Sequence, residues 1–167
     1  SVANRLLREY AANLGLDVGF SVLDRGDAAD LMDVARQELG LADGRRRFPR
    51  KDTCLAIYSR RVNSRAELAD CLEANWPWCM EWAEELRTLF GRYVELKQAG
   101  VMLDYDDLLL WWHALMASPA LAAAVGERFD HVLVDEYQDT NVLQAEILLR
   151  LKPDGSGLTV VGDDAQS

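Results

Sequence analysis

The sequence is short of the residues that stabilise secreted proteins and of the apolar runs that cross membranes. Its cysteines, Cys54, Cys71 and Cys79, are odd in number and lack the paired spacing of a metal site, so we predict reduced, buried thiols. No apolar run approaches the roughly 20 residues that a membrane-spanning helix needs, and no secretory signal is visible at the N-terminus. We therefore predict a cytoplasmic protein without a membrane partner.

Lysine and histidine are also scarce. The lysines are Lys51, Lys97 and Lys152, and none of them follows a glycine. A phosphate-binding loop needs glycines for close backbone approach and a lysine that reaches the phosphates, so the 167 residues contain no such loop. The two histidines, His113 and His131, are isolated, and we interpret His131, at the start of an expected strand, as structural.

Positive charge is scarce overall but concentrated in one segment. The net charge of −10 argues against a general nucleic-acid-binding surface. Residues 45–65 nevertheless contain a single acid, Asp52, and eight basic residues: Arg45, Arg46, Arg47, Arg50, Lys51, Arg60, Arg61 and Arg65. Such a patch can meet a phosphate backbone. The alternative is a solvated helix face whose arginines pair with nearby acids, and both interpretations stay open.

Residues 1–126 have the pattern of a mostly helical region, because apolar positions repeat at helical spacing between glycine, proline and capping residues. We expect helices over residues 2–14, 27–39, 49–62, 68–72, 80–99 and 104–117, and an extended stretch at residues 20–23. Ser64 and Glu67 have capping-box spacing, which predicts that the fourth helix starts there. The helical spacing of the tryptophans favours core packing over a base-stacking surface.

From residue 127 the pattern changes to strand and helix in alternation. Residues 131–134 form an apolar strand of the kind found in parallel sheets covered on both faces. Residues 141–151 are a helix started by Asp139 or Thr140, and residues 158–161 are a second strand. This order predicts a right-handed βαβ unit with parallel strands. The predicted fold class is therefore mostly α with a small α/β part.

Two carboxylates follow the first strand directly, at Asp135 and Glu136. In an open α/β sheet, ligands bind at the carboxyl ends of the strands. Adjacent carboxylates at that place suit a hydrated Mg²⁺ and can activate a water for attack on a phosphate. The sequence therefore indicates phosphate chemistry at this strand end.

Four segments resemble motifs of the UvrD/Rep/PcrA family of superfamily 1 DNA helicases. Val134-Asp-Glu-Tyr-Gln-Asp-Thr-Asn141 resembles the second motif, and Val160-Val-Gly-Asp-Asp-Ala-Gln-Ser167 resembles the third. Leu103-Asp-Tyr-Asp-Asp-Leu-Leu-Leu110 resembles the family's Asp-aromatic-Asp-Asp-Leu element, although its acids also suit simple helix capping. Ser1-Val-Ala-Asn-Arg-Leu-Leu-Arg8 resembles the segment after the family's Thr-Phe-His element. The resemblance spans the whole chain in the family's order.

The resemblance implies a division of the chain and a set of roles. Residues 1–126 would be the helical insertion subdomain called 1B, and residues 127–167 a partial RecA-like P-loop ATPase domain with its Walker B and third motifs. Asp135 would hold Mg²⁺ through a water, and Glu136 would act as general base. Gln166 would sense the γ-phosphate of ATP. Asp139 and Thr140 would couple the nucleotide site to DNA, or cap a helix.

The implied partners are single-stranded and duplex DNA, with movement in the 3′ to 5′ direction. Contacts to DNA would come from the basic segment, at Arg45, Arg46, Arg47, Arg50 and Lys51. Because the phosphate loop is missing, we expect an internal helicase fragment that is inactive alone. Its strand at residues 158–161 should expose an unpaired edge that favours self-association. The alternative is a stand-alone DNA- or protein-binding module with a vestigial ATPase edge.

Overall fold

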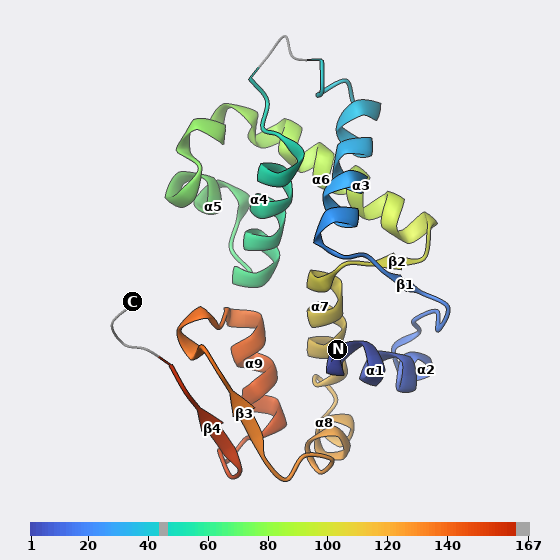
Figure 1. Cartoon of the computed structure of the whole chain (residues 1–167), viewed down its shortest axis with the longest axis vertical. Coiled ribbons are helices and arrows are strands. Elements are labelled where there is room, and N and C mark those ends of the chain that lie inside the picture. Colours follow the sequence, from blue (N-terminus) through green and yellow to red (C-terminus); the bar gives the residue numbers. More distant parts are fainter. Residues whose placement is uncertain (44–46, 163–167) are drawn as a thin grey trace. The chain divides into compact units, whose positions relative to one another are not determined.

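The computed structural model describes residues 1–43 and 47–162 and divides into two compact units (Figure 1). One unit comprises Gly19–Asp107, and the other combines Ser1–Val18 with the chain from Leu108 onward. Across the described residues no single helix is long and apolar enough to cross a membrane. One pair, Tyr105–Leu115 with Pro119–Gly126, reaches the length and composition together but is bent by 109°.

The unit Gly19–Asp107 is built from helices around one core. It contains α3 (Arg25–Glu38), α4 (Lys51–Ser64), α5 (Leu68–Asn75), the 3₁₀ helix η1 (Pro77–Trp82) and α6 (Ala83–Ala99). Buried Met32, Leu55, Leu72, Leu89 and Phe90 are among the residues that join these helices in a single hydrophobic cluster. The helical character predicted for this region is confirmed.

Of two short strands in this unit, the first was predicted from the sequence and the second was not. The extended stretch at residues 20–23 forms β1 (Ser21–Val22), which pairs in parallel with β2 (Met102–Leu103). Two residues are too few to show a strand pattern, so β2 could not be predicted. Its partner β1 lies about eighty residues away in the sequence. The ladder places the first residues of this unit beside its last ones.

The predicted capping box at Ser64 is wrong. Ser64 is the last residue of α4, and its hydroxyl donates to the carbonyl oxygen of Arg60 at 2.6 Å. Helix α5 starts after Glu67 without a side-chain cap. The hydroxyl bonds back into its own helix, as serines near helix ends can. At α3 the cap is Asp24, and Asp27 completes a capping box from the third helical position.

The second unit contains helices and a two-stranded parallel sheet. Its elements are α1 (Val2–Glu9), α2 (Ala11–Leu14), the greater part of α7 (Tyr105–Leu115), α8 (Pro119–Gly126), β3 (Val132–Val134), the 3₁₀ helix η2 (Tyr137–Asp139), α9 (Val142–Leu151) and β4 (Leu158–Val160). Val132 pairs with Leu158 and Val134 with Val160. The predicted order of strand, helix and parallel strand is therefore confirmed, with each element within two residues of its predicted bounds.

The compact units do not follow the predicted boundary at residue 126. Leu6 from α1 and Val125 from α8 are buried in the same cluster as Ile147 and Leu151 from α9. A boundary after residue 126 would cut through this core. Hydrophobic contact between the two ends of the chain therefore sets the division.

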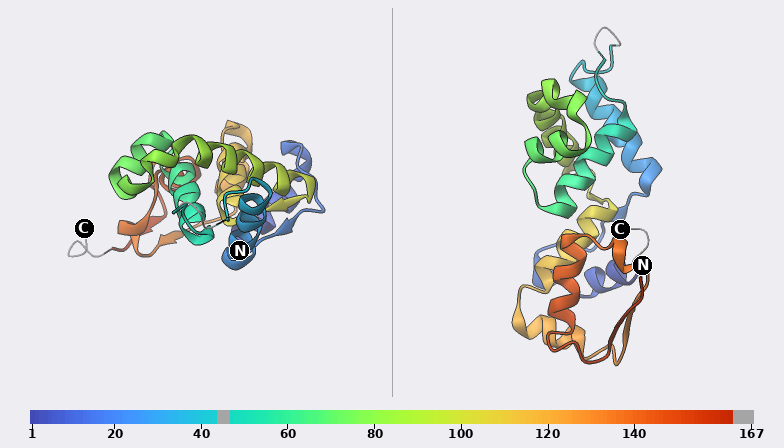
Figure 2. Two further views of the ribbon diagram at one scale, coloured as in Figure 1. Left: turned by 90° about the horizontal axis from the view of Figure 1, so that it is seen from above. Right: turned by 90° about the vertical axis from the view of Figure 1, so that its left-hand side faces the viewer.

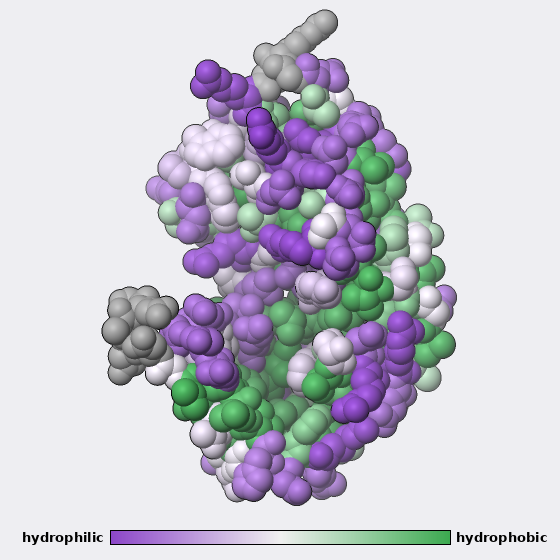
Figure 3. Space-filling model, viewed as in Figure 1, coloured by the Kyte–Doolittle hydropathy of each residue, from purple (hydrophilic) through white to green (hydrophobic). Residues whose placement is uncertain are grey.

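The sheet is covered on one side rather than on both. Helix α9 lies on one side of the two strands (Figure 2), and hydrophobic surface is visible over the sheet (Figure 3). Leu133 is 70% exposed, and Val160 and Val161 are about half exposed. The expectation of a strand covered on both faces is thus not met within these residues.

Candidate functional site

The carboxylates of Asp135 and Glu136 lie at the carboxyl end of β3, and both residues are exposed. Glu136 adopts a left-handed backbone conformation with φ of 50°, which is uncommon for a residue with a side chain and costs about 1 kcal/mol or more. Its N–H donates to Asp135 Oδ1 at 2.9 Å. The next N–H, from Tyr137, donates to the carbonyl of Val161 at 3.0 Å. These bonds fix a sharp turn that directs both carboxylates to the strand end.

The carboxylate of Glu136 is oriented by a neighbouring amide. The side-chain amide of Gln138 donates to Glu136 Oε2. An amide donor orients a carboxylate without neutralising its charge. The side-chain amide of Gln138 therefore helps to hold the Glu136 carboxylate in place.

Asp139 and Thr140 do not cap α9, contrary to prediction. The cap is Asn141, whose side chain accepts the N–H of Gln144 at 2.9 Å, and the Gln144 side chain accepts the N–H of Asn141 at 3.2 Å. A capping box needs this three-residue spacing. Asp139 and Thr140 therefore have no part in the side-chain cap of α9.

The structure brings four of the predicted site residues around one cavity of about 480 Å³. Its polar lining includes Asp135, Glu136, Asp139 and Thr140. The apolar part of the lining includes Leu109 and Trp112 of α7, with Ile147 and Leu148 of α9. Apolar walls with a few polar groups are the usual composition of a small-molecule site.

The oxygen ligands at this cavity suit Mg²⁺. Mg²⁺ keeps several waters and takes one or two carboxylates from the protein, and Asp135 could supply one of them. No group of three or more metal-binding side chains occurs in the part of the chain that the structure describes. A single carboxylate would leave most of the coordination of a Mg²⁺ ion to water or to a phosphate, unlike the four protein ligands of a closed structural metal centre.

The remaining predicted site residues divide into two groups. Gln166, Arg45 and Arg46 lie outside the described residues. Arg50 is exposed just before α4. Lys51 instead pairs with Asp30 of α3 at 2.5 Å, as expected for a solvated helix face. Arg47 lies within the described residues and is exposed, like Arg50.

The unit Gly19–Asp107 contains a buried ionic network that was not predicted from the sequence. The ammonium of Lys97, on α6, lies 2.8 Å from Asp104 Oδ2 and 2.6 Å from Asp107 Oδ2. Tyr93 donates its hydroxyl to Asp104 at 2.7 Å, and Lys97 lies 3.3 Å from the hydroxyl of Tyr58. Lys97 and Asp104 are at most 3% exposed. Removing one member of such a buried pair typically costs about 3–5 kcal/mol.

The pKa values within this network shift in different directions. Burial alone would lower the pKa of Lys97, but Tyr58, Asp104 and Asp107 outweigh burial and raise it. Burial opposes ionisation of Asp104, yet the charge of Lys97 and several hydrogen bonds lower the pKa of Asp104. For Asp107, burial and the charge of Asp104 raise the pKa to about 6. The two acids share one lysine, and Asp104 is the better stabilised anion.

A signal for this network was present in the sequence. Lys97 continues the apolar stripe of α6 that runs through Leu86, Phe90 and Tyr93, at spacings of four, three and four residues. A lysine on a buried helix face needs a charged partner. The acids of the Asp-aromatic-Asp-Asp-Leu element follow within ten residues.

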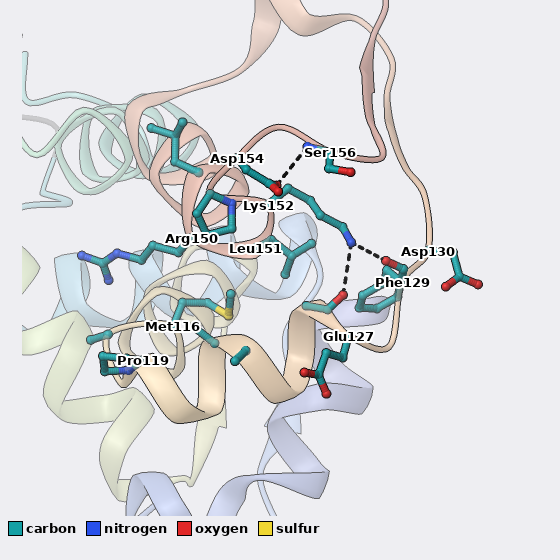
Figure 4. Close-up of a pocket in the computed structure, with 16 residues that line it drawn as sticks. Met116, Pro119, Glu127, Phe129, Asp130, Arg150, Leu151, Lys152, Asp154 and Ser156 are labelled. Carbon is teal, nitrogen blue, oxygen red and sulfur yellow. Dashed lines mark hydrogen bonds between the residues drawn. The ribbon is translucent and has the colours of Figure 1, made fainter.

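A larger cavity of about 900 Å³ lies beside α8 and the end of α9 (Figure 4). Lys152 lies in its wall and donates to the carbonyl oxygens of Phe129 at 2.6 Å and Gly126 at 3.4 Å. The ammonium thus satisfies carbonyls at the carboxyl end of α8. Its position predicts a structural role for Lys152, not a phosphate-binding one.

The cysteines behave as the sequence predicts, but the tryptophans do so only in part, since Trp78 is 55% exposed. Cys54, Cys71 and Cys79 are free and buried, and burial raises the pKa of Cys54 to about 12. Trp82 packs in the helical core, edge-on to Phe48.

Comparison with known proteins identifies the family. The model of the "UvrD/REP helicase N-terminal domain" matches residues 1–167. The chain belongs to this family. Relatives of this UvrD/REP domain include "ATP-dependent DNA helicase UvrD1" of Mycobacterium tuberculosis (strain ATCC 25618 / H37Rv), 35% identical over 178 residues, covering 100% of the chain and 22% of the relative.

Two further relatives of the UvrD/REP domain have similar coverage. "ATP-dependent DNA helicase PcrA" of Leuconostoc citreum is 31% identical over 168 residues, covering 100% of the chain and 22% of the relative. "DNA helicase II" of Escherichia coli (strain K12) is 27% identical over 172 residues, covering 99% and 22%. The chain spans about a fifth of the length of these relatives. The predicted family is confirmed over the whole chain.

Proposed function

We propose that this chain is part of an ATP-dependent DNA helicase that moves along single-stranded DNA in the 3′ to 5′ direction and separates duplex DNA. The observation that carries the proposal is the pair Asp135–Glu136 at the end of β3, opening on a cavity beside Asp139 and Thr140. The helicase names of the relatives support it.

In this proposal the carboxylates divide the chemistry. Asp135 would hold Mg²⁺ through a water, and the bound ion would supply positive charge for the phosphates of ATP. Glu136, held by Gln138, accepts the proton of the attacking water. Asp139 and Thr140 couple the nucleotide site to the DNA path. They are available for this role because Asn141 supplies the cap of α9. Gln166 is proposed as the γ-phosphate sensor.

The architecture suggests which unit does what. The unit formed by the two ends of the chain carries β3, β4 and the carboxylates, so we assign it to the RecA-like motor domain. The helical unit Gly19–Asp107 lies between those ends in sequence. We therefore assign it to the insertion subdomain, narrower than residues 1–126, with Arg47 and Arg50 as DNA contacts.

The test replaces Glu136 by Gln in a longer protein that carries this chain together with a phosphate-binding loop. The amide keeps the shape of the side chain but cannot accept a proton, so we expect ATP hydrolysis to fall by about 10²–10⁴-fold while ATP still binds. Glu127→Gln, an exposed glutamate outside this cavity, is the matched control and should retain turnover.

The same experiment separates the second candidate, a DNA- or protein-binding module with a vestigial ATPase edge. The missing phosphate loop favours that candidate. If the longer wild-type protein binds DNA but hydrolyses no ATP, the binding module replaces the helicase as the proposed function. If Glu136→Gln turns over ATP at the wild-type rate, Glu136 is not the base.

A further inference from the structure

The backbone of Val161 forms two hydrogen bonds that enclose the carboxylate pair. Its N–H donates to the carbonyl oxygen of Val134 at 2.8 Å, and its own carbonyl oxygen accepts the N–H of Tyr137 at 3.0 Å. These partners stand immediately before Asp135 and immediately after Glu136 in the sequence. The chain that leaves β4 is therefore fastened to the turn that carries both carboxylates.

Gly162, the next residue, lies against the side chain of Gln138. A Cβ atom added at Gly162 would lie 2.7 Å from Gln138 Oε1, which is closer than non-bonded carbon and oxygen atoms approach. It would lie 3.5 Å from the backbone nitrogen of Gln138 and 3.5 Å from Tyr137 Cβ, which are ordinary contacts. A glycine is needed where another group approaches the backbone this closely. The amide of Gln138 thus occupies the space that a side chain at position 162 would take.

The same amide group reaches Glu136. Its nitrogen donates to Glu136 Oε2, while the 3₁₀ helix η2 fixes the backbone of Gln138. In η2 the N–H of Asp139 donates to the carbonyl oxygen of Glu136 at 2.9 Å, and the N–H of Thr140 donates to that of Tyr137 at 3.0 Å. Glu136 is exposed, whereas Gln138 is partly buried. A donor held in this way limits the rotamers that a solvated glutamate would otherwise sample.

We propose that Gln138 is a positioning residue for Glu136 and that its place depends on Gly162. The amide oxygen lies against Gly162, and the amide nitrogen orients the carboxylate. The contact therefore links the chain just after β4 to the orientation of Glu136. A displacement of about 1 Å at a reacting group can change a rate by about 100-fold, so this link would adjust hydrolysis. Its importance for hydrolysis rests on the proposed function of Glu136.

The first test needs no nucleotide and uses NMR of the 167-residue chain. Gly162→Ala places a methyl group against the end of a flexible side chain, so the chain should fold and the amide of Gln138 should move. We expect the carboxyl carbon of Glu136 to change its chemical shift, and Gln138→Ala to change it in the same direction. Gly91→Ala is the matched control, because a Cβ atom there meets nothing within 4 Å. It should leave the Glu136 signal unchanged.

The double variant makes this test decisive. Once Gln138→Ala has removed the amide, adding Gly162→Ala should not move the Glu136 signal further, because two changes that act through one contact are not additive. If Gly162→Ala alone unfolds β3 and β4, the double variant should fold again, since the group that the methyl meets is gone. An unchanged Glu136 signal in folded Gly162→Ala, additive shifts, or a double variant that stays unfolded would overturn the proposal.

The second test measures ATP hydrolysis by a longer protein that carries this chain together with a phosphate-binding loop. Gln138→Ala and Gly162→Ala should each lower kcat by about 10- to 100-fold, with KM for ATP within about twofold of the wild type. Adding Gln138→Ala to Glu136→Gln should cost nothing more, whereas an undiminished further loss would show that Gln138 does not act through Glu136. If the wild-type longer protein hydrolyses no ATP, the proposed function fails, and the NMR result still decides the contact.

Discussion

At the scale of single residues, Asp107 is the carboxyl group whose charge the fold opposes most clearly. Its pKa is raised from 3.8 to about 6 by burial and by the charge of Asp104. Between these two values the folded chain binds more protons at this site than the unfolded chain does. Stability from Asp107 is therefore fully present below the unfolded pKa of 3.8 and is lost as the pH rises through about 6.

This shift predicts a measurable effect of Asp107→Asn on pH dependence. The amide mimics the neutral carboxyl and does not titrate. The free energy of unfolding of the variant minus that of the wild type should therefore increase by about 1–2 kcal/mol when the pH is raised from about 4 to about 7. Urea denaturation followed by circular dichroism at the two pH values measures it. Asp43→Asn, an exposed acid of the same unit, should show no such gain. Equal stability differences at both pH values would show that Asp107 is ionised throughout.

Some residues of the site were predictable and others were not. Asp135 and Glu136 could be found because they follow an apolar strand directly, and strand ends in parallel sheets are where ligands bind. The bond from Gln138 and the cap at Asn141 depend on a turn whose backbone conformation no propensity specifies. Lys97 was overlooked because its partners are defined by the packing of α6 against α7.

At the scale of elements, the sequence pattern predicted a helix or strand correctly where the residues of that element determine its structure. The βαβ unit follows from apolar periodicity and chain length alone. The pairing of β1 with β2 does not, because two-residue strands carry almost no pattern and their register depends on the helices between them. Ser64 shows the same limit, since a serine can cap the next helix or bond back into its own.

The segment before α4 carries a prediction about DNA. Replacing Arg47 and Arg50 by Ala should weaken DNA binding without regard to sequence. The log–log dependence of affinity on salt should become less steep by about 0.7–0.9 for each phosphate that an arginine no longer neutralises. Fluorescence anisotropy at several salt concentrations measures this slope. Arg87→Ala, an exposed arginine on α6, is the control; equal slopes in all three proteins would assign the segment to surface solvation.

The strand β4 carries a prediction about self-association. Among the described residues β4 pairs on one side only, with β3, and Val161 beside it is 51% exposed. Open apolar edges recruit other strands, and a lysine blocks them. We expect concentration-dependent dimers in analytical ultracentrifugation, reduced by Val161→Lys but not by Leu149→Lys on α9. A wild-type chain that stays monomeric with strong hydrogen-exchange protection at residues 158–161 would contradict an open edge.

At the scale of the whole chain, the molecule supplies one part of a reaction site and lacks another. The carboxylates at β3 suit Mg²⁺ and a water, but the 167 residues contain no glycine-rich loop with a lysine to hold the phosphates. Phosphate cradles and arginines from a second domain contribute several orders of magnitude in such reactions. The chain should therefore fold and position its carboxylates without turning over ATP.

The most direct test is a side-by-side measurement of ATP hydrolysis, with and without single-stranded DNA. One sample is the purified 167-residue chain, and the other is a longer protein that carries this chain together with a phosphate-binding loop. We predict DNA-stimulated turnover by the longer protein, and none by the chain alone at equal concentration. Turnover by the pure chain, or a longer protein that binds DNA yet hydrolyses no ATP, would contradict the assignment of Asp135 and Glu136 to an ATP-driven motor.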